Sequence, residues 1–315
     1  MGEGFLQIFM QMAMLFLIVG VGYLCKKAGW MTQEFDRGFS KLILNAVLPC
    51  MILGSVLDAE TLPTMEQMIT MFAFGTLSYV VMLAVGMVMT FAMRISHGHR
   101  GVFRYMMLFG NVGFIGFPVI TAIFGPEALI YASLYQFPFN FLAYTLGAYF
   151  LTQDNEKGVK VKVSPKVFLS PAVVSCVVAV VLTVAGIHGV PVLGPGLETL
   201  GGMTTPGALL IIGSSLANLP LRELVGGPRL WMSAAVRLVI TPLLVMLLFS
   251  RFGLDPLILG VIVILCGMPV ATNGTMLCYE YGGDAKTMSQ GTFITTLFCL
   301  VTIPLLTTVL TACGF

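Results

Sequence analysis

Long apolar segments alternate with short polar ones along the chain. Each apolar segment has about the 20 residues that an α-helix needs to cross the hydrocarbon core of a bilayer. The segments are continuous and lack the alternating pattern of membrane barrel strands, which excludes a barrel. The pattern predicts ten membrane-spanning helices, numbered here as spans 1 to 10, at residues 5–25, 39–57, 68–93, 102–124, 128–151, 167–187, 197–219, 230–249, 256–279 and 287–313.

Composition agrees with an all-α polytopic membrane protein. Hydrophobic residues make up 57% of the chain and charged residues 10%, whereas a soluble domain carries about 25% charged residues. So few charges cannot cover a surface that faces water. The seven cysteines are scattered, with no CxxC pair, so we expect no disulfide framework, no metal site and no cofactor. There is no basic stripe of the kind that binds nucleic acid.

The basic residues are distributed unevenly between the loops. Apart from Arg237 and Arg251, the 16 Lys and Arg residues lie in odd-numbered loops or at their edges. Cytoplasmic loops are enriched in Lys and Arg. The odd-numbered loops are therefore predicted to be cytoplasmic, and both termini to lie on the other side of the membrane.

Spans 2, 4, 7 and 9 carry proline and glycine in corresponding places of the two halves. Five spans per half is an odd number, so the halves must cross the membrane in opposite senses. We therefore predict a first five-helix repeat at residues 1–151, a cytoplasmic linker at 152–166 and a second, inverted repeat at 167–315. Inverted repeats with interrupted helices are typical of secondary transporters, whose sites lie near the midplane where the breaks meet.

Spans 4 and 9 are predicted to be broken helices that cross and form the substrate site. Proline and glycine interrupt a helix, and the freed backbone groups persist in a membrane only where protein, water or substrate binds them. Half-helix N-termini and asparagine amides suit an anion. The alternative is that the prolines make packing kinks and the asparagines cap carbonyls. The predicted binding residues of these spans are Asn111, Gly113, Pro118, Pro269, Thr272 and Asn273.

Further polar residues inside spans 2 and 5 are candidates for the same site. Gln136 and Asn140 are four residues apart and share one helix face. They either form a polar wall of the pocket or make hydrogen bonds between helices. Asn45 in span 2 is the remaining amide candidate.

Arg237 is an ionisable residue well inside span 8. Charges inside a membrane are costly and often functional. Arg237 is therefore predicted either to contact the anion or to pair structurally with carbonyl groups or with a carboxylate such as Glu280.

Several motifs together resemble those of the auxin efflux carrier family, which includes plant carriers and bacterial malate or malonate permease-like proteins. The motifs are GVGYL at 20–24 followed by two lysines, LNAVLP at 44–49, Asn111 and Pro118 in span 4, and Pro269 with the acidic and hydroxyl positions downstream of it. The resemblance implies a scaffold of spans 1, 2, 6 and 7, a transport domain of spans 3–5 and 8–10, and an elevator-like motion. The chain lacks the long cytoplasmic loop of the larger plant carriers, which favours a compact bacterial member.

The expected function is secondary transport of small organic anions by alternating access, with malate-like, malonate-like or auxin-like carboxylates as substrates. One alternative is a sodium-coupled organic anion symporter of bile-acid-carrier type. Another is a sensor or sterol-binding module that uses a carrier fold without transporting. No nucleophile–base or metal constellation occurs in the spans, so we do not expect an enzyme. Sodium binding and a homodimer remain open.

Overall fold

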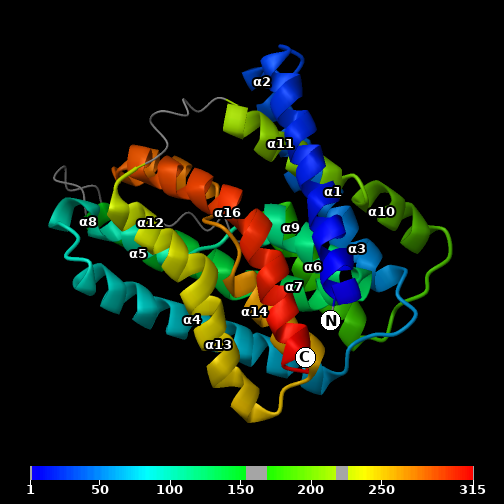
Figure 1. Cartoon of the computed structure of the whole chain (residues 1–315). Coiled ribbons are helices and arrows are strands. Elements are labelled where there is room, and N and C mark those ends of the chain that lie inside the picture. Colours follow the sequence, from blue (N-terminus) through cyan, green and yellow to red (C-terminus); the bar gives the residue numbers. More distant parts are fainter. Residues whose placement is uncertain (1, 154–168, 218–225, 315) are drawn as a thin grey trace. The chain divides into compact units, whose positions relative to one another are not determined.

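The computed structural model describes residues 2–153, 169–217 and 226–314. Every regular element of these residues is helical, and an isolated antiparallel bridge joins Gly110 to Val270. Figure 1 shows the helices in chain order. The α-helices are α1 (Gly2–Lys27), α2 (Gln33–Leu42), α3 (Leu48–Leu57), α4 (Met65–Ala92), α5 (Arg100–Leu108), α6 (Phe117–Phe124), α7 (Leu129–Leu142), α8 (Ala148–Gln153), α9 (Pro171–Val184), α10 (Leu193–Gly201), α11 (Thr204–Ala217), α12 (Pro228–Ala235), α13 (Thr241–Phe249), α14 (Pro256–Cys266), α15 (Asn273–Tyr281) and α16 (Ala285–Ala312).

Each predicted span is helical over most of its described residues, although several boundaries differ. The second span begins earlier than predicted, at Gln33, because the polar helix α2 precedes its apolar part. The predicted linker at 152–166 lies outside the described residues from position 154 onward.

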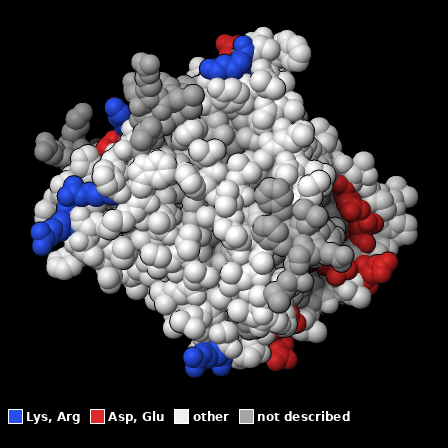
Figure 2. Space-filling view, in the orientation of Figure 1, with Lys and Arg blue, Asp and Glu red and all other residues white. Residues whose placement is uncertain are grey.

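Within the described residues, five helical segments are long and apolar enough to cross a membrane. Their bounds are Gln33–Leu57, Met65–Ala92, Leu193–Ala217, Pro228–Phe252 and Ala285–Ala312. Large apolar side chains such as Phe91 and Leu17 are more than half exposed, and Figure 2 shows a surface on which charged side chains are sparse. Exposed apolar side chains on long apolar helices are the property of a protein embedded in lipid, so the chain is an integral membrane protein.

Of the four π-helical turns in the part of the chain that the structure describes, three end two residues before a proline. These turns are η1 (Ile43–Val47), η3 (Val112–Gly116) and η8 (Val236–Ile240), and the prolines that follow are Pro49, Pro118 and Pro242. A proline ring clashes with the carbonyl four residues before it. That carbonyl lies in the middle of the widened turn in each case, so the π-turn lets the helix continue past the proline.

The chain divides into two compact units. Unit 1 consists of Met1–Phe72, Gly113–Leu134 and Phe168–Pro220, and unit 2 consists of Ala73–Val112, Tyr135–Val167 and Leu221–Phe315.

In unit 1, α1 packs along α11 through glycines (Figure 1). A Cβ atom at Gly22 would collide with the backbone of Leu210, and one at Gly213 would collide with the backbone of Val19. The two helices therefore approach each other to backbone contact, as small residues allow in membranes.

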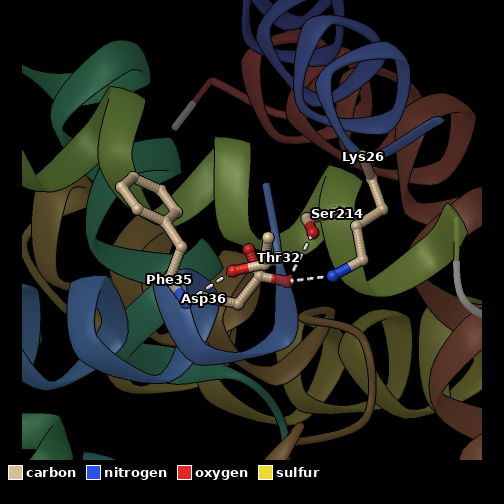
Figure 3. Close-up of polar contacts among 5 residues, drawn as sticks. All are labelled: Lys26, Thr32, Phe35, Asp36 and Ser214. Carbon is tan, nitrogen blue, oxygen red and sulfur yellow. Dashed lines mark hydrogen bonds and ion pairs between the residues drawn. The ribbon is translucent and has the colours of Figure 1, made fainter. Parts of the chain in front are cut away.

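The polar end of this helix pair is held by a carboxylate. Asp36 of α2 accepts hydrogen bonds from the Lys26 ammonium and the Ser214 hydroxyl, each at 2.7 Å (Figure 3). Thr32 caps α2 by accepting from the Phe35 N–H at 3.2 Å. These contacts fasten α1, α2 and α11 to one another.

Unit 1 also contains a pocket of about 350 Å³. Its lining includes the carboxylates Asp58, Glu60, Glu127 and Glu198, and Figure 2 shows acidic side chains gathered over the region of α3 and α10.

In unit 2, α16 contacts α12, α14 and α15, and α5 contacts α8. The N-terminus of α16 is capped by Asp284, whose carboxylate accepts from the Thr287 N–H at 3.1 Å and the Thr287 hydroxyl at 2.6 Å. His99 lies 3.0 Å from the same carboxylate. The interior of unit 2 is formed largely by the buried residues of α5 and α14 and by the residues that follow these helices.

Candidate functional site

Two helices of unit 2 stop inside the fold. Helix α5 ends at Leu108, and Phe109 has extended backbone. Helix α14 ends at Cys266, and regular helix resumes at Asn273 with α15. The helices of spans 4 and 9 are therefore interrupted, as predicted. Helix α5 does not continue as a kinked helix, and helical structure resumes only at η3.

The two breaks pair with each other through their backbones. The N–H of Asn111 donates to the carbonyl of Pro269 at 2.7 Å, and the N–H of Ala271 donates to the carbonyl of Phe109 at 3.1 Å. Residues 109–111 and 268–271, called the paired breaks below, thus form a short antiparallel pair. Each break supplies hydrogen bonds that the other lost by leaving its helix, which a water-free interior requires.

Local sequence explains why the second break lies where it does. Pro269 has no N–H and disfavours a helical conformation at Met268. The N–H of Val270 then donates to the hydroxyl of Thr295 at 3.0 Å. Because Thr295 belongs to α16, this bond fastens the break to a continuous helix.

Arg237 of η8 is 1% exposed and binds the ends of both interrupted helices. Its Nε donates to the carbonyl of Met268 at 3.0 Å. Its Nη1 lies 2.9 Å from the carbonyl of Met107 and 3.1 Å from that of Leu108. The same nitrogen is 3.2 Å from the sulfur of Met82. Arg237 therefore pairs with carbonyl groups, which was one of its two predicted roles.

The charge of Arg237 is balanced by helix ends. Within the described ranges the ion pairs are Lys26–Asp36 and His99–Asp284, and neither involves Arg237. The C-terminus of a helix carries roughly half a negative charge. Two such ends, those of α5 and α14, face one guanidinium and compensate it.

Asn111 and Asn273 are the two asparagines predicted for the site. Asn111 is 4% exposed and lies within the paired breaks. Asn273 is the first residue of α15, and its Oδ1 accepts from the hydroxyl of Tyr105 at 3.1 Å. Since the oxygen is used by Tyr105, the Nδ2 group of Asn273 is left as the donor. Thr272 is exposed and occupies the N-cap position without a side-chain cap bond.

The two amides of span 5 that were predicted to share a helix face contact each other within α7. The Nε2 group of Gln136 donates to Oδ1 of Asn140 at 3.2 Å. The Oε1 atom of Gln136 is buried, and no described residue donates to it. Phe139, on the same helix, packs edge-on against Phe109 with ring centroids 5.9 Å apart. Helix α7 therefore contacts the first of the paired breaks.

Three predicted residues belong to unit 1. Asn45 lies in η1 and is exposed. Gly113 lies in η3, and Pro118 is buried in the first turn of α6. No group of His, Cys, Asp and Glu suited to a metal ion occurs in the described part of the chain.

Tyr105 and Thr295 were missed from the sequence. Tyr105 is fully buried, and a buried tyrosine hydroxyl needs a partner, which is a usable signal in an apolar helix next to a break. Thr295 carries no such signal, because threonines in membrane helices commonly bond to their own helix, as this one also does through the carbonyl of Gly291 at 2.7 Å.

Comparison with known proteins decides the family. A family model described as a membrane transport protein matches residues 7–307. The chain belongs to this family. The predicted membership of the auxin efflux carrier family is thereby confirmed.

Relatives of this membrane transport protein come from archaea and bacteria. An uncharacterized transporter of Methanothermobacter thermautotrophicus is 25% identical over 301 residues, which cover 93% of this chain and 95% of the relative. An uncharacterized transporter of Methanocaldococcus jannaschii is 23% identical, with 92% and 94% covered. The uncharacterized transporter YfdV of Escherichia coli K12 is 20% identical, with 92% and 93% covered. The chain is therefore a membrane transporter.

Proposed function

We propose that this transporter is a secondary carrier of small organic anions, with carboxylates as the preferred class, and that the anion binds at the paired breaks. The observation that carries the proposal is the pairing of two interrupted helices in the buried interior of unit 2, with the N–H of Asn111 on the carbonyl of Pro269. Interrupted helices that meet in a membrane protein are typical of carrier sites.

The groups beside the paired breaks suit a ligand that brings its own negative charge. Helix α15 begins at Asn273, so its N-terminal partial positive charge lies next to the second break. Tyr105 holds the Oδ1 atom of Asn273, which leaves the amide nitrogen to donate. A carboxylate accepts from both the amide and the first N–H groups of the helix, and such charge-assisted bonds are strong.

The two compact units support a division into scaffold and transport domains. Unit 1 contains the helices of spans 1, 2, 6 and 7, and unit 2 contains most of spans 3, 5, 8, 9 and 10. Span 4 is divided between them at residues 112 and 113. We propose ten membrane helices in two inverted repeats, with unit 2 as the moving body of an elevator-like cycle.

The orientation follows from the charges of the loops. Basic residues are concentrated in the odd-numbered loops, so both termini are proposed to face away from the cytoplasm. The membrane is proposed to be a bacterial inner membrane, and the substrates to be malate-like, malonate-like or auxin-like acids.

A binding screen followed by a flux assay tests this function. Purified protein is heated with malonate, malate, indole-3-acetate and neutral analogues such as malonamide. We expect at least one carboxylate to raise the melting temperature and the neutral analogues to have no effect. Any acid that binds is then tested for uptake into proteoliposomes, with sodium and proton gradients imposed separately.

The outcomes separate the alternatives. Uptake that follows the membrane potential alone supports an uncoupled anion carrier, whereas accumulation driven by sodium promotes the symporter. Stabilisation by sterols without flux of any acid would contradict a transport function.

A further inference from the structure

We propose that Arg237 is a positioning residue that clamps the two breaks together and does not itself bind the anion. This inference deepens the proposed function and rests on it for the statement that the ligand is an anion. The clamp itself is a property of the fold. It assigns a role to Arg237, for which the sequence left two roles open.

Arg237 directs its N–H donors at the ends of both interrupted helices. A guanidinium has five N–H groups. Arg237 directs Nε at Met268 after α14 and Nη1 at Met107 and Leu108 at the end of α5. These carbonyls are ones that a continuing helix would have bonded. The side chain therefore replaces the missing helical hydrogen bonds of both interrupted helices at once.

Little space remains around Nη2, the third nitrogen of the guanidinium. A Cβ atom at Gly110 would collide with Nη2 of Arg237, and it would also lie 3.3 Å from Cβ of Met268. Nη2 is thus pressed against the backbone of the first break, with no room for a ligand atom on that side. At this position the chain needs glycine so that the guanidinium can reach across.

The buried charge of Arg237 also favours its role as a clamp. Arg237 is 1% exposed, and a guanidinium that lost its partners at this depth would be strongly unfavourable. The clamp cancels the negative ends of α5 and α14 near the paired breaks. An anion then meets the positive end of α15 without meeting the opposing helix ends.

The test measures backbone hydrogen exchange, which needs no ligand. The reporters are the N–H groups of Asn111 and Ala271, which bridge the paired breaks. The variants are Arg237→Lys, which keeps the charge but loses the fork, and Arg237→Gln. Arg229→Gln is the control, because Arg229 is exposed on the neighbouring helix α12. We expect exchange at 109–112 and 268–272 to rise at least about tenfold in both Arg237 variants and to stay unchanged in the control.

A second variant keeps the test decisive if the Arg237 variants do not fold. Gly110→Ala forces the guanidinium aside, so it should raise exchange at the same peptides. Gly86→Ala is its matched control, because a Cβ at Gly86 meets Cβ of Met107 at an ordinary 3.5 Å. Equal exchange in Gly110→Ala and Gly86→Ala would overturn the clamp.

Binding of malonate, or of whichever acid the screen finds, then distinguishes a clamp from a ligand. For a clamp, affinity falls together with the loss of protection at the paired breaks. Unchanged protection combined with a selective loss of anion affinity in Arg237→Lys would show direct contact and contradict the proposal. Raised exchange in a protein that binds no acid at all would leave the clamp standing and remove the proposed function.

Discussion

Two cations in the apolar helices of this protein have different partners, and the difference shows what each one does. Lys26 in unit 1 is 12% exposed at its side chain and lies 2.7 Å from the carboxylate of Asp36 (Figure 3). Arg237 in unit 2 is bonded to carbonyls and a thioether. A lysine–carboxylate pair is neutral and fastens helices, whereas an arginine on carbonyls fastens backbone that has left its helix.

The two cations also leave different electric fields in their surroundings. The Lys26–Asp36 pair cancels itself locally. Arg237 cancels the negative ends of α5 and α14 but not the positive start of α15 at Asn273. The interior of unit 2 therefore keeps a positive helix end beside unwound backbone, and this is the arrangement that favours an anion.

The largest effect is expected from removing the charge of Arg237. Arg237→Met leaves three buried carbonyls without their donor, and each unsatisfied buried acceptor costs about 1–3 kcal/mol. We expect a much lower melting temperature in detergent and poor recovery of monodisperse protein. Arg229→Met serves as the control. A melting temperature equal to that of the parent protein would mean that the carbonyls find other donors.

The next effect is mainly on binding. Asn273→Ala removes the amide that Tyr105 orients, and a hydrogen bond to a charged group contributes about 1.5–3 kcal/mol. Anion affinity should fall roughly ten- to a hundredfold. The melting temperature without ligand should fall modestly, because the buried hydroxyl of Tyr105 loses its acceptor. Asn111→Ala is expected to act in the same direction. Titration calorimetry with the acid from the screen measures both, and unchanged affinity in both variants would place the site elsewhere.

Breaking the other cation pair should affect stability alone. Lys26→Met leaves the hydroxyl of Ser214 as the one donor to the carboxylate of Asp36 among the described residues, at a cost of about 1–3 kcal/mol. The double variant Lys26→Met with Asp36→Asn should recover most of this loss, because no unpaired charge remains. Anion affinity should be the same in all three proteins. A loss of affinity in the single variant would mean that the two cations are not independent.

The smallest effect is expected at the cap of α16. Asp284→Ala removes the bonds to Thr287 and should cost about 0.5–2 kcal/mol. Burial raises the pKa of Asp284, but the hydrogen bonds of Thr287 and the charge of His99 outweigh it, so the net pKa lies below its ordinary value. A lowered folded-state pKa stabilises the protein above the unfolded value, about 3.9, and the contribution is lost as the pH falls through the folded value. The stability difference between Asp284→Ala and the parent, measured by denaturant unfolding, should therefore shrink as the pH falls below about 3.9.

Much of the fold was predictable because apolar length and proline position are local signals. The breaks after Leu108 and Cys266 follow from the glycines and from Pro269, which the sequence displays directly. The backbone pairing of residues 109–111 with 268–271 joins the breaks of spans 4 and 9, whereas the crossing of these spans and the inverted repeat stay predictions. The place of the π-turns was not predicted, although each one before a proline has a steric reason.

The partners of the site were less predictable than its position. Two roles were open for Arg237, since a sequence does not show which carbonyls are left unbonded in the folded chain. Tyr105 precedes Asn273 by so many residues that only the fold brings hydroxyl and amide together, at 3.1 Å. Asn45, Gly113 and Pro118 were grouped with the site by their place in the spans, and the grouping of residues from unit 1 with the paired breaks stays a prediction.

The central claim is that an organic anion crosses the membrane at the paired breaks of unit 2. The most direct test is the current from proteoliposomes on a solid-supported membrane after a jump in the concentration of the acid found by the screen. The pH is held constant, so that the ionised fraction of the acid does not change. The account predicts a current with the sign of inward negative charge for the parent protein and for Gly86→Ala, and its loss in Asn273→Ala. Currents of equal size in the parent protein and Asn273→Ala would contradict it.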